Sequence, residues 1–481
     1  MVRTLACYLL GALLSFQAPS NTPSRTDTTF EVAELIAEKA PSCGGLDDED
    51  VASADGRKVA WRCRANNKWT VLVNGVPQGG AFDEVRSLIF SPNSEHLAFA
   101  ARRDKKWMVV EDGNERPGTY ADVGLPRYSE DGKRMAFRAK PAKKWVLVVD
   151  GTPQPAEFDG IVTTTFSPDG QRIAYLGRRG EKYTVVVDGK EDSTFDIVSG
   201  IRFSSDSRRI VYAGADVKRG FGKEKALGRV SIDGTAGPSF EGAQVGGLLK
   251  SMATGSITRL VTGYLPQFWA DTHGVSTPVF SPDGARVAYA ARREKDAIVV
   301  FLDGEPGKAF PPIVAGPVFS PDNRRIAFAT TVDEATALVL DGVIVGKGPA
   351  AGTTFISNLT FAPDNERLAY IGVTGGSMWD QGYTARARRR VYVDGVAGKE
   401  YDVPYLGRLA FGHDGKHVSY VVGGLTEGSR KVDFVVINTR EGDRYDAVLG
   451  PGRFNGDGRT LRYTAQAGGK FYAVRVSLEG A

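Results

Sequence analysis

Histidine and cysteine are scarce in this chain, with only 4 histidines and 3 cysteines among 481 residues. Zinc and similar transition metals are bound mainly through these two residue types, so the sequence offers little material for such a site. His413 and His417 are four positions apart but flank a predicted turn, and we expect neither to bind a metal. The sequence therefore predicts no metal site and no cofactor.

Long apolar runs are also missing, except for one near the N-terminus. Residues 5–16 (LACYLLGALLSF) follow the basic Arg3 and precede a polar stretch, which is the layout of a secretory signal peptide. This run is shorter than the roughly 20 residues that a helix needs to cross a membrane. We expect a signal peptide over residues 1–18, export to the periplasm or the extracellular space, and no membrane span after cleavage. An uncleaved N-terminal membrane anchor is the alternative.

Removal of the signal peptide would also remove Cys7 and leave an even pair of cysteines, Cys43 and Cys63. Such a pair in an exported protein predicts a disulfide bond, because oxidising compartments favour its formation. The bond would tie the N-terminal segment to the first of the repeats described below. Two buried free thiols are the alternative.

Two further absences narrow the class of protein. The sequence contains no Gly-x-Ser-x-Gly motif, the turn that carries the nucleophile of α/β-hydrolases. The formal net charge is only +4, which is too small to indicate nucleic-acid binding by itself. What the chain does contain is 58 glycines and a hydrophobic fraction of 42%, which fit many short strands joined by tight turns. The composition predicts an all-β protein.

A short turn motif recurs ten times along the chain, and it reads FSPDG both at 166–170 and at 280–284. The other copies begin at Ala52, Phe90, Tyr128, Phe203, Phe319, Phe361, Phe411 and Phe454. The first five copies start 38, 38, 38 and 37 residues apart, and such a fixed period indicates a repeat architecture. Proline, aspartate and glycine each have a conformational role in a tight turn, so we expect the repeated aspartates to be structural.

Each repeat of about 40 residues reads as four short strands. Two β-prone runs surround the turn motif, as at 200–203 and 209–212. A third run ends in Asp-Gly, a strong hairpin signal, for example at Asp188, and a fourth carries Phe-Asp, for example at Phe158. Four antiparallel strands per repeat make one blade of a β-propeller. A solenoid of β-arches is the competing repeat fold.

The sequence FSPDG, followed by the strand at 172–175 and then by VVVDG, resembles the repeats of the TolB-like branch of WD40-like propellers. The resemblance covers most of residues 50–481 and implies a β-propeller. It implies no particular function, since such blades serve many roles. The chain lacks the α/β domain that precedes the propeller in TolB, so the partner of that protein is not implied.

Five repeats span residues 28–241 and five span residues 280–481, with an irregular crossover or a degenerate blade at 242–279 between them. We therefore expect about ten four-stranded blades, in one large ring or in two smaller propellers. The last repeat lacks a fourth strand, which residues 29–32 could supply to close the ring. A helix over residues 30–40, with a capping box at its start, is the alternative for the N-terminus.

The strands predicted to line the channel carry no pair of acids. From the copy at Phe90 onward, the four residues before each motif aromatic include arginines and small hydroxyl residues but no aspartate or glutamate. A propeller that hydrolysed glycosidic bonds would need two carboxylates there. The sequence therefore predicts no catalytic residue.

Basic residues gather instead in the loop between the second and third strands, and in a propeller these loops share one face. A basic face favours an anionic partner, whereas a solvated rim of mixed charge is the alternative. Two insertions in the same loop class, 216–229 and 378–390, are also basic. The predicted ligand-binding residues of this basic loop face are Arg102, Arg103, Arg178, Arg179, Arg292, Arg293, Arg388, Arg389 and Arg390.

The sequence thus predicts a monomeric, exported, non-enzymatic propeller that binds a protein or an anionic envelope polymer, and not nucleic acid. The alternative is a hydrolase or lyase that acts on envelope polysaccharide. Its catalytic residues would lie in the loop at 264–273, where Trp269, Asp271 and His273 stand close together.

Overall fold

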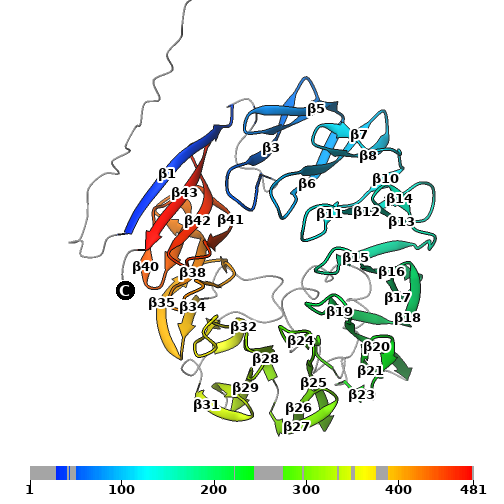
Figure 1. Ribbon diagram of the computed structural model, residues 1–481, viewed down its shortest axis with the longest axis vertical. Helices are drawn as coiled ribbons and strands as arrows, with labels where there is room; N and C mark the ends of the chain where they lie inside the picture. The colour runs from blue at the N-terminus through cyan, green and yellow to red at the C-terminus, as the bar shows by residue number, and fades with distance from the viewer. Residues whose placement is uncertain are drawn as a thin grey trace, which may run out of the picture.

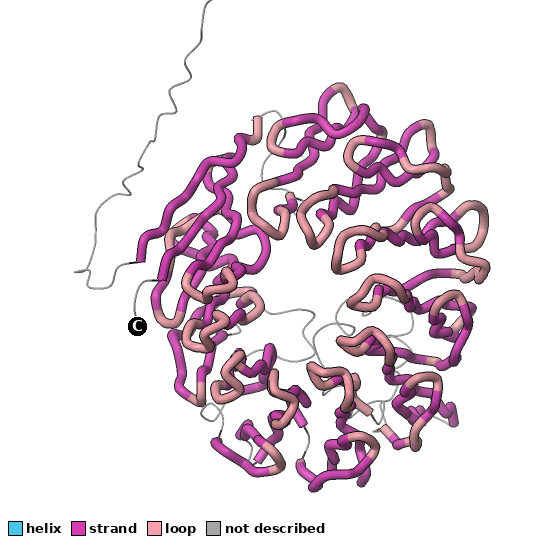
Figure 2. Tube along the Cα trace, in the orientation of Figure 1, coloured by secondary structure: helices cyan, strands magenta, loops and turns pink. Residues whose placement is uncertain are grey.

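Ten antiparallel sheets surround a central axis in one ring (Figure 1). The computed structural model describes residues 29–40, 43, 50–220, 223–242, 275–294, 297–311, 313–332, 335–347, 353–374 and 388–478. These residues form strands and loops and contain no α-helix (Figure 2). The prediction of an all-β propeller of about ten blades is confirmed, as a single ring, and the competing solenoid is wrong.

The first five blades follow one another along the chain and around the ring. Blade 1 comprises β2 (Val51–Ala52), β3 (Val59–Ala65), β4 (Lys68–Val73) and β5 (Val76–Phe82). Blade 2 comprises β6 (Glu84–Phe90), β7 (Leu97–Arg103), β8 (Lys106–Glu111) and β9 (Asn114–Glu115). Blade 3 comprises β10 (Asp122–Val123), β11 (Arg127–Tyr128), β12 (Met135–Lys140), β13 (Val146–Val149) and β14 (Thr152–Pro153). Blade 4 comprises β15 (Gly160–Phe166), β16 (Ile173–Arg179), β17 (Lys182–Val187) and β18 (Lys190–Phe195). Blade 5 comprises β19 (Ile197–Phe203), β20 (Ile210–Gly220), β21 (Lys223–Ile232), β22 (Thr235–Ala236) and β23 (Phe240–Glu241).

The other five blades complete the ring. Blade 6 comprises β24 (Val279–Phe280), β25 (Val287–Glu294), β26 (Ala297–Leu302) and β27 (Glu305–Phe310). Blade 7 comprises β28 (Ile313–Phe319), β29 (Ile326–Val332), β30 (Ala335–Leu340) and β31 (Val343–Lys347). Blade 8 comprises β32 (Thr353–Phe361), β33 (Leu368–Thr374), β34 (Arg388–Val393) and β35 (Val396–Asp402). Blade 9 comprises β36 (Tyr405–Leu406), β37 (Ala410–Phe411), β38 (Val418–Glu427), β39 (Arg430–Ile437) and β40 (Arg440–Glu441). Blade 10 comprises β41 (Ala447–Phe454), β42 (Thr460–Ala467), β43 (Lys470–Leu478) and β1 (Thr29–Glu38).

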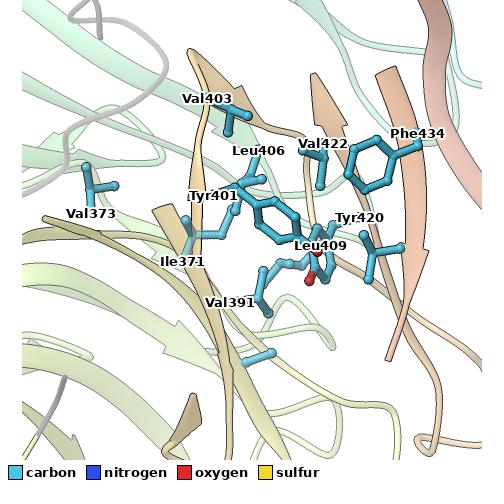
Figure 3. Packing of buried hydrophobic residues seen from close by; sticks show 12 residues of the cluster. Ile371, Val373, Val391, Tyr401, Val403, Leu406, Leu409, Tyr420, Val422 and Phe434 are labelled. Atoms are coloured by element: carbon cyan, nitrogen blue, oxygen red, sulfur yellow. The ribbon is translucent and has the colours of Figure 1, made fainter. Parts of the chain in front are cut away.

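The hydrophobic core lies between neighbouring blades. In blades 8 and 9, Ile371 and Val391 of one sheet pack with Val422 and Phe434 of the next, all of them almost fully buried (Figure 3). The second and third strands of a blade are covered on both faces, which is why these runs are almost continuously apolar. Each pair of neighbouring blades therefore shares an apolar layer.

The Phe-Asp marker supplies an aromatic ring to each of several such interfaces. The ring of Phe158 meets that of Tyr175 in the next blade edge-on, with 6.1 Å between centroids, a favourable geometry for aromatic pairs. Equivalent pairs are Phe82–Phe99, Tyr120–Phe137, Phe195–Tyr212, Phe310–Phe328 and Tyr445–Tyr463.

The N-terminal strand β1 closes the ring. It pairs antiparallel with β43, from Thr29 opposite Leu478 to Glu38 opposite Lys470, and so becomes the outermost strand of blade 10 (Figure 1). The alternative of a helix at 30–40 is wrong, because β43 would otherwise expose an unpaired edge, and a strand satisfies that edge.

The interface between blade 10 and blade 1, here called the closure seam, is held by three kinds of contact. Lys39 and Asp50 form an ion pair of 3.0 Å in which each side chain is only 2% exposed. Cys43 and Cys63 form a disulfide bond. The rings of Trp61 and Phe471 stack with 5.3 Å between their centroids.

Blades 5 and 6 are direct neighbours although the chain between them is long. Arg209 Nη1 donates a hydrogen bond of 2.8 Å to the carbonyl of Ala285, and Ser199 and Thr277 bring their hydroxyl oxygens to 3.5 Å. Most of the predicted crossover or degenerate blade, residues 243–274, lies outside the described residues, as does the predicted signal peptide at 1–18. Within the described ranges, no helix is long and apolar enough to cross a bilayer.

Candidate functional site

The repeated turn motif uses its serine and aspartate to hold its own backbone. Ser167 Oγ donates to Asp169 Oδ1 at 2.6 Å and accepts from the Arg172 amide at 2.9 Å. The hydrogen bond from Ser167, and then that from the backbone of Gln171, lower the pKa of Asp169. Gly170 has a φ of +72°, which a residue with a side chain rarely adopts. These contacts give the motif aspartates a structural role.

In six of the ten blades, an arginine five residues after the second position of the turn motif bonds to the Asp-Gly turn of the same blade. Arg172 Nε donates to Asp188 of the Asp-Gly turn at 2.9 Å. Its Nη1 donates to the carbonyl of Arg208 in the next blade at 2.7 Å, and its guanidinium lies over Phe203 of that blade. The arginines that pair with the Asp-Gly aspartate in this way are Arg134, Arg172, Arg209, Arg286, Arg325 and Arg367. We call this set the arginine ladder.

Sequence reasoning missed the arginine ladder, although the signal was present. The same offset from the motif serine carries an arginine in blade after blade, and a period-by-period alignment of the repeats would have isolated it. The face that carries the turn motif and the ladder is called the turn face below.

The Phe-Asp aspartates have an equivalent role on the opposite face. Asp159 Oδ2 accepts a hydrogen bond of 2.8 Å from the amide of Gly180 in the next blade, and Oδ1 accepts from Lys144. The hydrogen bond from Lys144 is the main cause that lowers the pKa of Asp159. Both aspartate markers are therefore explained by structure.

The predicted basic loop face lies opposite the turn face. Arg102, Arg178 and Arg292 lie near the end of the second strand of blades 2, 4 and 6, where each pairs with the start of the third strand. Arg388 begins the third strand of blade 8, opposite Thr374. These positions belong to the same hairpin of each blade, so the ring brings their backbones to one face.

Most of these arginines have a glutamate beside them. Arg102 pairs with Glu84 at 2.8 Å, and Arg103 pairs with Glu115. Arg179 forms two hydrogen bonds with Glu191, and its guanidinium lies 4.2 Å from the centroid of Phe158. Glu191 accordingly has a lowered pKa, mainly because of its hydrogen bonds with Arg179. Acidic neighbours therefore offset part of the positive charge of the basic loop face.

The remaining arginines differ in how open they are. Arg178 donates a hydrogen bond of 3.0 Å to the carbonyl of Gly180, and its positive charge helps to lower the pKa of Asp159. Arg292 is half-buried and Arg293 is exposed. Arg388 and Arg390 share one carboxylate, Glu400, at 3.4 and 2.9 Å.

Arg389 does not fit the predicted surface. Its side chain is 1% exposed and donates a hydrogen bond to the carbonyl of Val403. Alternation along β34 turns this residue inward while its two neighbours face outward. Its inclusion among the ligand-binding residues is therefore corrected.

The two basic insertions are described to different extents. Residues 216–229 extend the hairpin of β20 and β21, where Arg229 pairs with Asp216 at 2.5 Å and Lys225 with Glu241 at 3.0 Å. Of the second insertion, residues 378–387 lie outside the described residues.

Arginines also occur on the innermost strands, near the axis of the ring. Arg86 donates to the carbonyl of Val123 at 2.7 Å and its guanidinium lies 3.8 Å from the centroid of Trp107. Desolvation lowers the pKa of Arg202 in blade 5, and the positive charge of Arg408 in blade 9 lowers it further.

A cavity of about 390 Å³ lies where blade 10 meets blades 1 and 2. Blades 1 and 2 contribute mostly apolar and small residues to its wall, such as Val51 and Ile89. Blade 10 contributes Arg453 and Arg462, and Glu130 is the acidic residue in the lining. Its place beside the closure seam distinguishes it from the basic loop face.

Among the residues that the structure describes, no three histidine, cysteine, aspartate or glutamate side chains are grouped to hold a metal ion. His417 lies 2.9 Å from Asp414 within its own turn. Trp269, Asp271 and His273 lie outside the described ranges, so the alternative of loop-borne catalysis stays a prediction.

The strand order and the ring define the class of protein, a ten-bladed β-propeller. No family model matches the chain, and no curated protein matches its sequence. Solved structures that are similar to it include a eukaryotic initiation factor, at 12% identity over 82% of this chain and 97% of that chain, with a TM-score of 0.44. An oligogalacturonate lyase in complex with manganese has 15% identity over 82% of this chain and 98% of that chain, with a TM-score of 0.33. TolB from Acinetobacter baumannii has 14% identity over 56% of this chain and 80% of that chain, with a TM-score of 0.25. These similarities concern the fold alone.

Proposed function

We propose that this chain is an exported, non-enzymatic and monomeric β-propeller that binds a protein or an anionic envelope polymer through its basic loop face. The main support for the proposal is the position of the arginines. Equivalent hairpins in blades 2, 4, 6 and 8 place arginines on one face. An extended anionic partner can contact several blades at once there, and its charge is attracted by the summed field of the arginines.

Export is supported by the signal-peptide layout of residues 1–18. The Cys43–Cys63 disulfide fits an oxidising compartment, because cytosolic conditions keep thiols reduced.

The arginines that are best placed to meet a partner are those without a carboxylate of their own. Arg178 and Arg293 form no ion pair within the described residues. Arg388 is the more exposed of the two arginines that share Glu400, with 65% of its side chain accessible. These three positions lie in blades 4, 6 and 8, so they are spread over a large part of the basic loop face.

The test begins with affinity capture from the native envelope, followed by binding measurements across a range of salt concentrations. Replacing Arg178, Arg293 and Arg388 together by serine should weaken capture about tenfold at low salt and flatten its salt dependence. If the triple variant captured the partner as well as the original protein does, the proposal would be wrong.

A matched control removes the same charge from the opposite face. Arg57, Arg208 and Arg324 are exposed arginines in the motif turns of blades 1, 5 and 7. Their joint replacement by serine should leave capture within about twofold of the original. Equal losses in the two triple variants would mean that net charge alone, and not the basic loop face, attracts the partner.

A further inference from the structure

Three arginines form a row across blade 10. Arg453 on β41 stands opposite Arg462 on β42, and Arg462 stands opposite Arg475 on β43. Residues directly opposite each other in antiparallel strands project from the same face of the sheet, with Cβ atoms about 5 Å apart. Like charges in such positions repel, so the row is unfavourable unless something else compensates it.

No carboxylate of the described residues compensates this row. The three side chains are exposed, and none of them takes part in an ion pair or hydrogen bond with its neighbours. The arginine ladder shows the contrast, since each of its members pairs with an Asp-Gly aspartate. The row is therefore not explained by the turn chemistry that repeats around the ring.

The row faces blade 1 across the closure seam. Leu461 and Tyr463, the neighbours of Arg462 along β42, pack on Val421 and Val435 of blade 9. Alternation along the strand turns Arg462 and Thr464 the other way, and both line the cavity of about 390 Å³. The inner two arginines of the row thus line a cavity that is partly open to solvent.

The cavity is large enough for a small molecule. Its volume lies at the lower end of the range typical of ligand pockets. Val51, Leu88 and Ile89 contribute apolar surface beside the two guanidinium groups, and a charge-assisted hydrogen bond from a guanidinium to an anion is stronger than a neutral one. Two arginines against one acid, Glu130, leave the lining with an excess of positive charge.

We propose that this cavity binds a small ligand with two oxyanion groups, carboxylate or phosphate, which are held by Arg453 and Arg462; a ligand of this kind is called a dianion below. Guanidinium groups match both oxyanions, with two parallel hydrogen bonds to each. The cross-strand spacing suits groups about 5 Å apart. Arg475, at the outer end of the row, adds to the attraction without lining the cavity. The site is separate from the basic loop face and does not rest on the partner proposed for it.

The experiment measures the binding of three probes to the full mature chain by calorimetry: pyrophosphate, glutarate and a neutral diol of similar size. We expect at least one of the two dianions to bind and the diol not to bind. Preference for pyrophosphate or for glutarate tells phosphate from carboxylate ligands. Failure of both dianions to bind would overturn the proposal.

The variant Arg453→Gln/Arg462→Gln should weaken dianion binding about 100-fold, since each substitution removes a charge-assisted hydrogen-bonding group. The matched control is Arg57→Gln/Arg459→Gln, which removes two exposed arginines from the adjoining motif turns of blades 1 and 10, outside the cavity lining. The control should change binding less than about threefold. Equal weakening in both variants, or retained binding in the first, would contradict the site.

Thermal unfolding without ligand separates loss of binding from loss of fold. Because Arg462 has an arginine on both sides, Arg462→Gln should keep or raise the midpoint of unfolding, yet abolish the upward shift that the dianion causes. A lowered midpoint without ligand would show that the row is structural.

Discussion

The closure seam and an ordinary interface between blades are stabilised by different kinds of contact. Between blades 8 and 9, a cluster of twelve buried hydrophobic residues fills the space, and the smaller cluster between blades 4 and 5 has five buried members. At the closure seam the corresponding cluster has four buried members, which are Ala37, Val59, Trp61 and Phe471. The closure seam also contains a buried ion pair, a disulfide bond and, beside it, a cavity lined by two arginines.

The difference follows from how the two interfaces connect the chain. Ordinary neighbours are consecutive in sequence, so packing them closes only short loops, whereas the closure seam joins the two ends of the propeller. Closing a longer loop costs more conformational entropy, although the cost grows slowly with length. The disulfide ties the segment after β1 to blade 1, and the ion pair holds the end of β1 against the start of blade 1. At the closure seam a covalent bond and a buried ion pair thus add to the apolar packing.

The largest expected effect is the loss of the buried ion pair at the closure seam. Lys39→Met would leave Asp50 buried without its ammonium partner, which typically costs about 3–5 kcal/mol. Unfolding in denaturant, followed by tryptophan fluorescence, measures the change. Lys68→Met is the control, because the pair between Lys68 and Asp83 is exposed and should contribute less than about 1 kcal/mol.

The double variant Lys39→Met/Asp50→Leu sharpens the same test. Replacing both members by apolar side chains removes both buried charges and should recover most of the stability that is lost in Lys39→Met. If the double variant were as unstable as the single one, the contribution would come from packing and not from charge.

The second prediction concerns the disulfide. Replacing Cys43 and Cys63 by serine should lower the free energy of unfolding by about 3 kcal/mol, because the bond closes a loop of 20 residues. Adding reductant to the original protein should destabilise it by the same amount and leave the serine variant unchanged. If reductant also destabilised the serine variant, its effect on stability would not come from the Cys43–Cys63 bond.

The third prediction tests an ion pair at an ordinary interface. Burial would raise the pKa of Glu441 in blade 9, but hydrogen bonds from Lys399, Arg444 and Tyr401 outweigh it and lower the pKa to about 2. A carboxyl group whose pKa is lowered by folding stabilises the protein above its unfolded pKa, and this stabilisation is lost as the pH falls toward the folded pKa. Here the window runs from about pH 4.5 down to about pH 2.

Glu441→Gln should therefore cost about 2 kcal/mol at neutral pH and reduce the loss of stability in that acidic window. Urea unfolding at several pH values measures both effects. Glu427→Gln is the control, because Glu427 bonds the same Arg444 but is more exposed. Parallel pH profiles for the two variants would contradict the assignment to Glu441.

Short sequence motifs were enough to predict much of the fold. Turn residues such as Asp169 and Gly170 have the same conformational role in every copy of the motif, so the blades could be predicted from the sequence. The missing fourth strand of the last repeat predicted that the N-terminus closes the ring. Contacts between repeats were not predictable in this way. The bond from Arg172 to the carbonyl of Arg208 depends on the distance between blades, which no single repeat encodes. The inward position of Arg389 depends on the register of β34, which follows an insertion.

The smallest expected effect comes from one member of the arginine ladder, which ordinary interfaces share. Arg172 bonds Asp188 in its own blade and two carbonyls of the next, so Arg172→Met should cost about 1 kcal/mol. Arg325 bonds Asp341 but donates to no carbonyl of the next blade within the described residues, so Arg325→Met should cost only about 0.3 kcal/mol. Denaturant midpoints of the two variants measure the difference, which isolates the contacts between blades. Equal costs would mean that the ladder stabilises the hairpins within each blade rather than the contacts between blades.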